Sequence, residues 1–249
     1  MKFRASLAMG AALAATLAWT YTPDNPTPLT DPPIASIGAL EFADGVLLAG
    51  DSVGGTIYAL EVGGSGSRGE FTAVDALDVK VADMLGTTTA EIFVKDLAVD
   101  QATGSAYLSL MRGSGPDAEP VLIRVSPDGS IEHLPFAGMA YTQLHLSDAP
   151  DSDPEARRNP RNSTITDIEM MGDTVYVAGL SNEEFASVLR RAPWPFEDSA
   201  TATGLEIYHG AHGQFETHAP VYTFMPLELD GEPHVLAGYL CTPLVTCAI

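Results

Sequence analysis

The sequence predicts an all-β fold, a β-propeller built from four-stranded blades. Three observations lead to this prediction. Short stretches rich in β-branched and aromatic residues recur along the chain, turn residues separate them, and a strand–turn–strand unit returns four times at intervals suited to blades.

The predicted strands are short and evenly distributed. The clearest are residues 46–49, 56–60, 106–110, 121–125 and 174–178. Asp44-Gly45 and Asp230-Gly231 each lie between two apolar runs. Because Asp and Gly both tolerate positive φ, these dipeptides predict tight hairpin turns.

The repeated unit occurs at residues 39–50, 96–109, 167–179 and 227–238. Its apolar anchors, Leu40, Leu97, Ile168 and Leu227, follow one another after 57, 71 and 59 residues. Each interval holds enough chain for a four-stranded sheet, which indicates propeller blades. Four copies leave open a ring of four large blades or an incomplete propeller. We favour the incomplete propeller, because no strand after the fourth repeat completes a ring, and we expect an exposed sheet edge.

One repeat carries a resemblance to a known group of proteins. Residues 96–100 followed by 103–109 resemble the inner hairpin of secreted bacterial propellers of the NHL, YVTN and gluconolactonase-like groups, and residues 175–182 are similar. The resemblance extends over residues 37–239. It implies the propeller fold and no particular activity, because such propellers serve unrelated functions.

A short helix is expected within the third repeat, at residues 181–191. Ser181 and Glu184 have the spacing of a capping box, and Phe185 begins an apolar face. Pro193 would end the helix. A helix here would lie over one mouth of the central channel or cover a sheet edge.

The N-terminus predicts export. Lys2 and Arg4 precede an apolar run at residues 5–18 that ends in small residues, as in a secretory signal peptide. That run is too short to span a bilayer, which takes about 20 residues, so we expect no membrane insertion after cleavage. The chain is thus divided into a signal peptide (1–18), a Pro-rich extended segment (19–34) and the propeller repeats (35–249). We expect a periplasmic or extracellular protein.

The formal net charge is −21. A surface this negative repels phosphate backbones, so nucleic acid is excluded as a partner. Cations, basic proteins and neutral ligands remain as candidates.

Two groups of residues are candidate metal ligands. Asp96 and Asp167 occupy equivalent positions just before inner strands, and Asp51 ends the first inner hairpin. Carboxylates that converge on the channel would bind Ca²⁺ or another hard cation. The alternative is that each Asp caps a turn through backbone hydrogen bonds.

The second group lies in residues 209–218, where imidazoles and one carboxylate are close in sequence. The candidate zinc ligands are His209, His212, Glu216 and His218. The His-Glu-x-x-His pattern of a helical zinc site is absent, so the alternative is a Gly-rich hairpin with incidental polar residues.

Three functions are compatible with these patterns. We favour a module that binds a small molecule or a protein at one mouth of the propeller. The second is a lactonase-like hydrolase that uses Asp96 and Asp167 with a divalent cation. The third, by analogy alone, is a quinone-dependent dehydrogenase, for which the chain has few basic residues.

Overall fold

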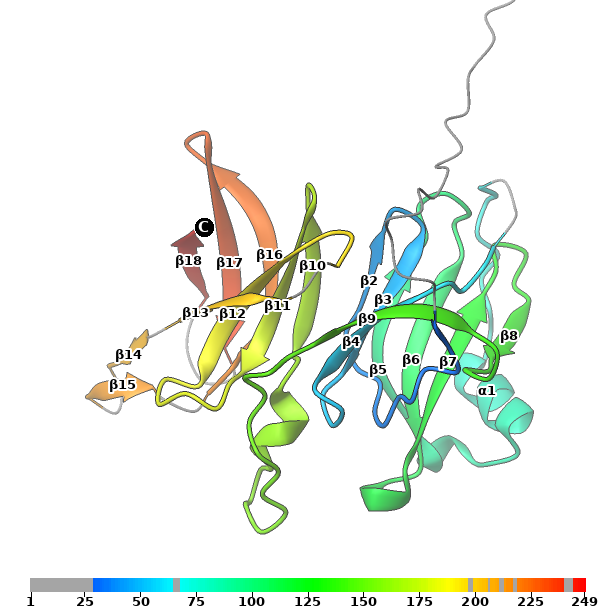
Figure 1. Cartoon of the computed structure of the whole chain (residues 1–249). Helices are drawn as coiled ribbons and strands as arrows, with labels where there is room; N and C mark the ends of the chain where they lie inside the picture. Colours follow the sequence, from blue (N-terminus) through cyan, green and yellow to red (C-terminus); the bar gives the residue numbers. More distant parts are fainter. Residues whose placement is uncertain are drawn as a thin grey trace, which may run out of the picture.

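The computed structural model describes residues 29–64, 68–196, 199–205, 207–210, 213–216, 219–239 and 244–249. Four antiparallel sheets are arranged in a ring as the blades of a four-bladed β-propeller (Figure 1). The all-β propeller expected from the sequence is therefore confirmed, and the structure has the ring of four blades rather than the incomplete propeller that we favoured. The expected signal peptide at 1–18 lies outside the described residues. We name each blade by its innermost strand.

The strands divide among the blades as follows. The β2 blade contains β2 (Leu40–Ala43), β3 (Val46–Asp51), β4 (Thr56–Leu60), β9 (Ala140–His145) and β1 (Leu29–Thr30). The β5 blade contains β5 (Ile92–Val99), β6 (Ala106–Arg112), β7 (Glu119–Val125) and β8 (Ile131–Leu134). The β10 blade contains β10 (Asp167–Met171), β11 (Thr174–Leu180), β12 (Ser187–Pro193) and β13 (Thr201–Gly204). The β16 blade contains β16 (Val221–Leu229), β17 (Glu232–Tyr239) and β18 (Val245–Ala248).

A separate hairpin and a few helical segments complete the described structure. The hairpin consists of β14 (Ile207–His209) and β15 (Gln214–Glu216), and the α-helix is α1 (Leu77–Leu85). The 3₁₀ turns are η1 (Thr89–Glu91), η2 (Gly115–Asp117) and η3 (Pro160–Ser163). Among the described residues, no helix has both the length and the hydropathy needed to cross a membrane.

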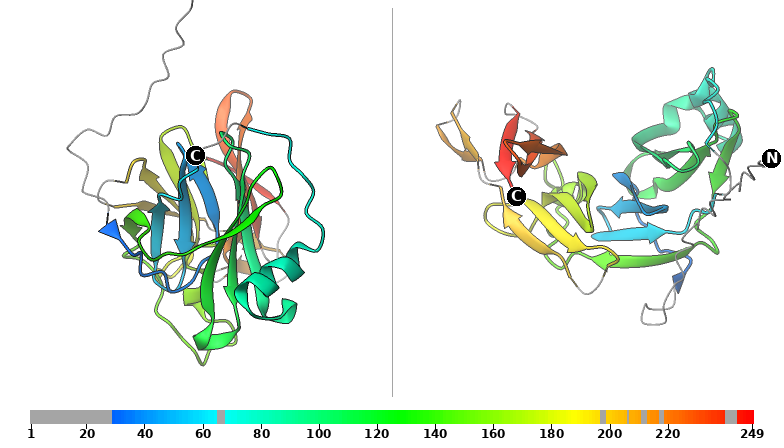
Figure 2. Two further views of the ribbon diagram at one scale, coloured as in Figure 1. Left: turned by 90° about the vertical axis from the view of Figure 1, so that its right-hand side faces the viewer. Right: turned by 90° about the horizontal axis from the view of Figure 1, so that it is seen from above.

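The blades do not follow one another around the ring in chain order. The inner strands are neighbours in the order β5, β2, β10 and β16, as the view from above in Figure 2 shows. The order differs because β9 returns to the β2 blade after the β5 blade has been completed, and pairs there with β4. The β2 blade is therefore built from two separate parts of the chain.

The predicted hairpin turns are confirmed. Asp44 and Gly45 connect β2 to β3 with φ values of 50° and 85°. Asp230 and Gly231 connect β16 to β17 with φ values of 53° and 82°. Two consecutive residues with positive φ give the turn that matches the twist of antiparallel strands, which explains the Asp-Gly pairs.

Buried hydrophobic clusters pack three junctions between neighbouring blades. Each cluster is formed by side chains from the two facing sheets: Leu47 and Tyr107 between the β2 and β5 blades, Leu48 and Val177 between the β2 and β10 blades, and Leu189 and Val235 between the β10 and β16 blades. Such face-to-face packing removes apolar surface from water and holds the ring together.

Small residues near the ends of β3 and β11 permit close approach of other segments. A Cβ atom on Gly50 would lie 2.7 Å from Cγ2 of Ile165, which precedes β10. A Cβ atom on Gly179 would lie 2.0 Å from the carbonyl oxygen of Thr164. The small residues that end the second strand of these repeats are therefore required by packing.

The fourth junction, between the β16 and β5 blades, differs from the other three. Within the described ranges, no buried hydrophobic cluster joins these two blades. Helix α1 instead packs on the face of the β5 blade that points away from the β2 blade, where it covers buried side chains of β6 and β7. Arg112 of β6 anchors the helix, because its Nη1 donates a hydrogen bond to the carbonyl oxygen of Leu85 at 3.1 Å.

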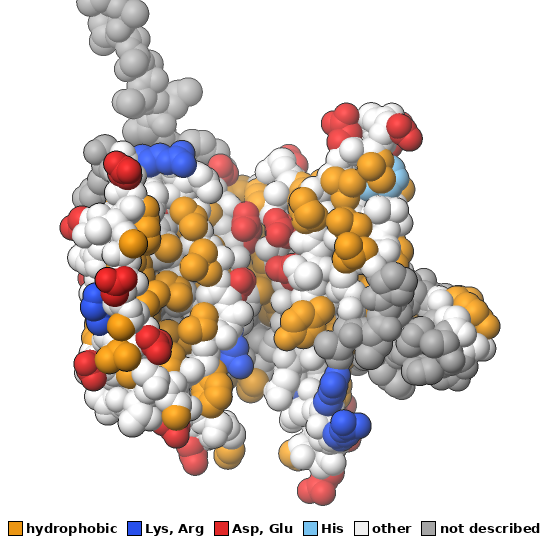
Figure 3. All heavy atoms as spheres, turned by 180° about the vertical axis from the view of Figure 1, so that it is seen from behind, with side chains coloured by type: hydrophobic (Ala, Val, Ile, Leu, Met, Phe, Trp, Pro, Cys, Tyr) orange, Lys and Arg blue, Asp and Glu red, His pale blue; other side chains and the backbone are white. Residues whose placement is uncertain are grey.

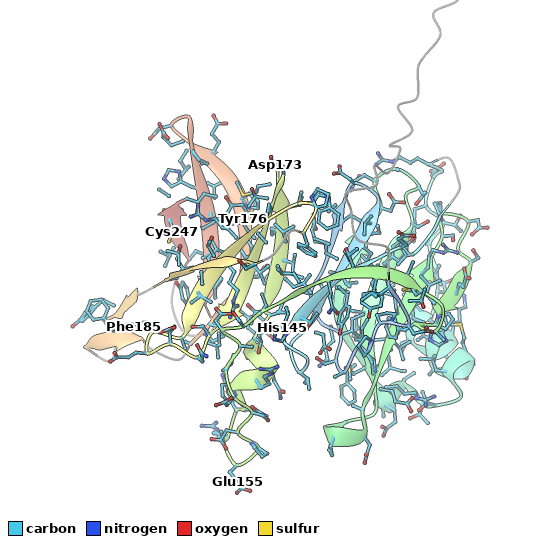
Figure 4. All side chains as sticks on the ribbon, in the orientation of Figure 1. His145, Glu155, Asp173, Tyr176, Phe185 and Cys247 are labelled. Atoms are coloured by element: carbon cyan, nitrogen blue, oxygen red, sulfur yellow. The ribbon has the colours of Figure 1, made fainter. Side chains whose placement is uncertain are left out.

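The expected helix at 181–191 is wrong. Residues 187–191 belong to strand β12, and Phe185 lies in the connection that leads into it (Figure 4). The strand is favoured because Arg190 is fully buried and its guanidinium Nε contacts both carboxylate oxygens of Asp148, at 3.0 and 2.9 Å. Its Nη atoms donate to the carbonyl oxygens of Thr164 and Leu180. This tertiary contact overrides the local helical pattern.

Candidate functional site

A polar pocket of about 500 Å³ lies at the mouth of the propeller where the inner strands begin. Residues from all four blades line it: residues 36–39 and 52–53 at the β2 blade, Phe93, Lys95 and Met111 of the β5 blade, residues 162–163 and 165–166 before β10, and Tyr222 of β16. A pocket to which every blade contributes is the typical ligand position in a closed β-architecture.

Two of the lining residues, Lys95 and Tyr222, are the extra residues of β-bulges. Pairing of β5 with β6 shifts register between Val94 and Asp96, which leaves Lys95 without a partner residue. Pairing of β16 with β17 shifts between Val221 and Thr223, which leaves Tyr222 without one. A bulge redirects a side chain out of the regular alternation and is frequent beside binding sites. Here both bulges lie where the strands reach the pocket.

The lining combines one positive charge, aromatic surface and hydroxyl groups. Among the described residues, Lys95 takes part in no ion pair. Phe93 and Tyr222 are exposed large hydrophobic residues. The side chains of Ser114, Asn162 and Ser163 add hydrogen-bonding groups. The Lys95 ammonium is therefore available to a ligand that carries a negative charge.

Asp51 shapes one wall of the pocket. Its side chain is fully buried, and its oxygens accept hydrogen bonds from the amides of Ala35, Ser36 and Gly54 at 2.8, 2.9 and 2.8 Å and from the Ser36 hydroxyl at 2.7 Å. These contacts fix the segment that runs into Ile37. Asp51 therefore caps the loops around it through backbone hydrogen bonds, which was the alternative to a cation ligand.

Asp96 and Asp167 connect neighbouring blades. Oδ2 of Asp96, on β5, accepts a hydrogen bond from the amide of Leu40, on β2, at 2.8 Å. Oδ2 of Asp167, on β10, accepts from the amide of Phe224, on β16, at 2.8 Å, and from the hydroxyl of Thr223 at 2.7 Å. Equivalent positions in two repeats thus make equivalent contacts across two blade junctions.

Glu41 of β2 and Glu169 of β10 form an acidic group with these two aspartates. Burial raises the pKa of Glu41 to about 7, and the carboxylates of Asp167 and Asp96 add to the effect. Burial likewise raises the pKa of Glu169 to about 7, with further contributions from Glu41, Asp167 and Asp96. The pKa of Asp167 is also raised by burial, against the hydrogen bonds from Phe224 and Thr223. Figure 3 shows acidic side chains between two flanks rich in hydrophobic side chains.

The metal sites proposed from the sequence stay predictions. Asp96 and Asp167 both lie on inner strands, whereas Asp51 is enclosed by its own loops. Across the described ranges, no group of three or more His, Cys, Asp or Glu side chains is arranged to hold a metal ion. The carboxylates of Asp51, Asp96 and Asp167 instead accept hydrogen bonds from backbone amides.

The predicted zinc cluster falls largely outside what the structure describes. His212 and His218 lie outside the described residues. His209 and Glu216 lie on opposite strands of the β14–β15 hairpin, where the register pairs His209 with Gln214 and Ile207 with Glu216. A hairpin at this position agrees with the alternative to a zinc site, a Gly-rich hairpin with incidental polar residues.

Comparison with known proteins adds no family to this description. No family model matches the chain, and no curated protein matches it. Fold and site together define a β-propeller with a ligand-sized pocket at one mouth.

Sequence reasoning missed Lys95, Tyr222, Glu41 and Glu169. Glu41 and Glu169 were detectable, because each directly follows the apolar anchor of its repeat. Lys95 and Tyr222 gave no such signal. Their importance depends on register shifts that exist only once the strands are paired.

Proposed function

We propose that this protein is an exported binding module that takes a small hydroxylated ligand in the mouth pocket. The observation that carries the proposal is the pair of β-bulges that directs Lys95 and Tyr222 into one pocket from blades on opposite sides of the fourth junction. Export is supported by the basic residues and apolar run at the N-terminus.

The pocket chemistry supports this ligand class. Aromatic faces such as those of Phe93 and Tyr222 pack against the apolar faces of a sugar-like ring. Hydroxyl and amide groups of Ser114, Asn162 and Ser163 exchange hydrogen bonds with ligand hydroxyls. The Lys95 ammonium favours a carboxylate on the ligand, so a sugar acid fits better than a neutral sugar.

The test is calorimetric titration of the full chain with galacturonate, gluconate, galactose and glucose. We expect 1:1 binding of at least one, and tighter binding of the acids. Lys95→Met should weaken binding of the acids about tenfold, the loss expected for one charged hydrogen bond of about 1.5 kcal/mol, and should leave neutral sugars less affected.

Matched controls separate the pocket from general surface effects. Tyr222→Ser is compared with Tyr208→Ser, because the two side chains are 60% and 61% exposed and Tyr208 lies on the distant β14–β15 hairpin. Lys95→Met is compared with Lys80→Met on α1. Equal losses in a variant and its control, or no binding of any of the four ligands, would refute the proposal.

A further inference from the structure

The blade faces at the fourth junction carry exposed apolar side chains on both sides. Seven of the fifteen exposed large hydrophobic residues in the described structure lie on β5 and β16. Phe93 and Tyr222 line the mouth pocket, and the other five lie outside it. This concentration on two strands is the pattern of an interaction surface, since scattered single apolar residues are the norm elsewhere.

Strand register shows which way these side chains point. On β5, Val94, Leu97 and Val99 pair with Leu110, Leu108 and Ala106, whose side chains belong to the cluster beneath α1. Cross-strand partners share a face, so these three β5 residues point away from the β2 blade. Helix α1 covers β6 and β7 and leaves these β5 side chains exposed.

The facing wall belongs to the β16 blade. Phe224 pairs with Ala237, and both are buried against the β10 blade. The next residue, Met225, pairs with Leu236 and lies on the opposite face, as does Leu229. Met225 is 54% exposed. The face of the β16 blade that would meet a neighbouring blade thus has no partner within the described structure.

The charge around these walls is mainly negative, and Lys95 is the one basic residue on β5 and β16. Glu41 and Glu169 lie on the inner strands between the two walls, and Glu228, Asp230 and Glu232 are exposed at the end of the β16–β17 hairpin. Figure 3 shows this arrangement from the side on which the two apolar flanks are visible, with acidic side chains between them. A second copy of the chain, with the same net charge of −21, would be repelled.

We propose that the fourth junction is a docking groove for an amphipathic basic segment of a partner protein. Apolar side chains of the segment pack on Val94 and Leu97 of the β5 blade and on Met225 and Leu236 of the β16 blade. The Lys or Arg residues of the segment lie toward the acidic inner strands. Burial of apolar surface supplies the affinity, and charge complementarity selects the partner and speeds association. This surface is distinct from the mouth pocket and from the small ligand proposed for it.

The test measures fluorescence anisotropy of a labelled peptide of leucine and lysine, with the two residue types on opposite helical faces, against the full chain. We expect saturable 1:1 binding that weakens as salt is raised, because exposed ionic contacts are screened. Two control peptides, one with glutamate in place of lysine and one with serine in place of leucine, should bind at least about tenfold more weakly.

Matched variants locate the binding surface. Leu97→Ser and Met225→Ser should each weaken binding of the leucine–lysine peptide about fivefold to tenfold. Leu29→Ser is the control, because Leu29 and Leu97 are 53% and 52% exposed and Leu29 lies on β1, in another blade. Glu41→Gln with Glu169→Gln should also weaken binding, whereas Glu155→Gln should not, since Glu155 lies at the far end of a loop (Figure 4).

Several outcomes would overturn the proposal. Failure of the leucine–lysine peptide to bind would exclude the groove as a docking site for this chemistry. Equal loss in Leu97→Ser and Leu29→Ser would mean that the peptide binds elsewhere. Light scattering that shows a dimer which Leu97→Ser and Met225→Ser dissociate would assign the surface to a second copy. Circular dichroism confirms that each variant is folded, and none of these results bears on ligand binding in the mouth pocket.

Discussion

The two faces of the β16 blade are built from the same strands and have opposite surroundings. Phe224 is 3% exposed and packs against the β10 blade, whereas the next residue, Met225, is 54% exposed at the fourth junction. Both faces carry large apolar side chains. The difference shows that apolar alternation along a strand defines two faces and does not say which neighbour each face meets.

The two kinds of junction differ in their polar contacts as well. At two of the three packed junctions, an aspartate accepts a hydrogen bond from a backbone amide of the neighbouring inner strand: Asp96 accepts from Leu40, and Asp167 accepts from Phe224. Within the described residues, no hydrogen bond of this kind links β5 to β16. Among the described residues, the fourth junction therefore has neither the hydrophobic cluster nor this hydrogen bond.

Substitution of adjacent residues on β16 should give the largest contrast. Phe224→Ala removes a buried aromatic side chain from a packed junction and should lower the free energy of unfolding by about 3–5 kcal/mol. Met225→Ala should change it by no more than about 0.5 kcal/mol, as for other exposed sites. Urea denaturation followed by tryptophan fluorescence measures both. Equal effects would mean that the two faces are equally packed in solution.

Loss of the hydrogen bond that joins Asp167 to the neighbouring blade should have an intermediate effect on stability. Asp167→Ala leaves the amide of Phe224 without its acceptor and should cost about 1–3 kcal/mol in unfolding free energy. Asp173→Ala is the control, because Asp173 lies in the exposed turn between β10 and β11 (Figure 4). The same denaturation experiment applies. If Asp173→Ala lowers the unfolding free energy as much as Asp167→Ala does, the hydrogen bond between Asp167 and Phe224 has no special role.

The smallest effect concerns pH. The folded-state pKa of Glu41 and of Glu169 is about 7, above the value of 4.5 usual for glutamate, so folding favours their protonated forms. The unfolded chain therefore releases these protons first as pH rises. Their contribution to stability is fully present below about pH 4.5 and is lost as the pH rises through 7.

Glu41→Gln should consequently stabilise the protein at pH 8 relative to wild type, by about 1 kcal/mol once solvent screening of a half-buried group is allowed for. At pH 5 the difference between variant and wild type should be smaller. Denaturation at the two pH values measures it. The control is Glu228→Gln, which replaces an exposed carboxylate at the equivalent repeat position. A stabilisation by Glu41→Gln that is independent of pH would contradict the assignment.

Much of the architecture was open to prediction from local pattern. Asp44-Gly45 and Asp230-Gly231 predicted the hairpins because positive φ at two successive residues is a local requirement. The equivalence of Asp96 and Asp167 was also visible as a repeat. The nature of their contacts was not, because a carboxylate before a strand serves a backbone amide as well as it serves a cation.

Local patterns were enough to predict the class of fold, the turns and the repeated inner strands, because period-two alternation and turn chemistry act between near neighbours. The strand at residues 187–191 depends on tertiary contacts, since burial of Arg190 against Asp148 outweighs helix propensity. The tertiary structure also placed β9 back in the β2 blade. The pocket and the unpacked junction depend on bulges and on sheet neighbours far apart in the chain, and no local pattern encodes such contacts.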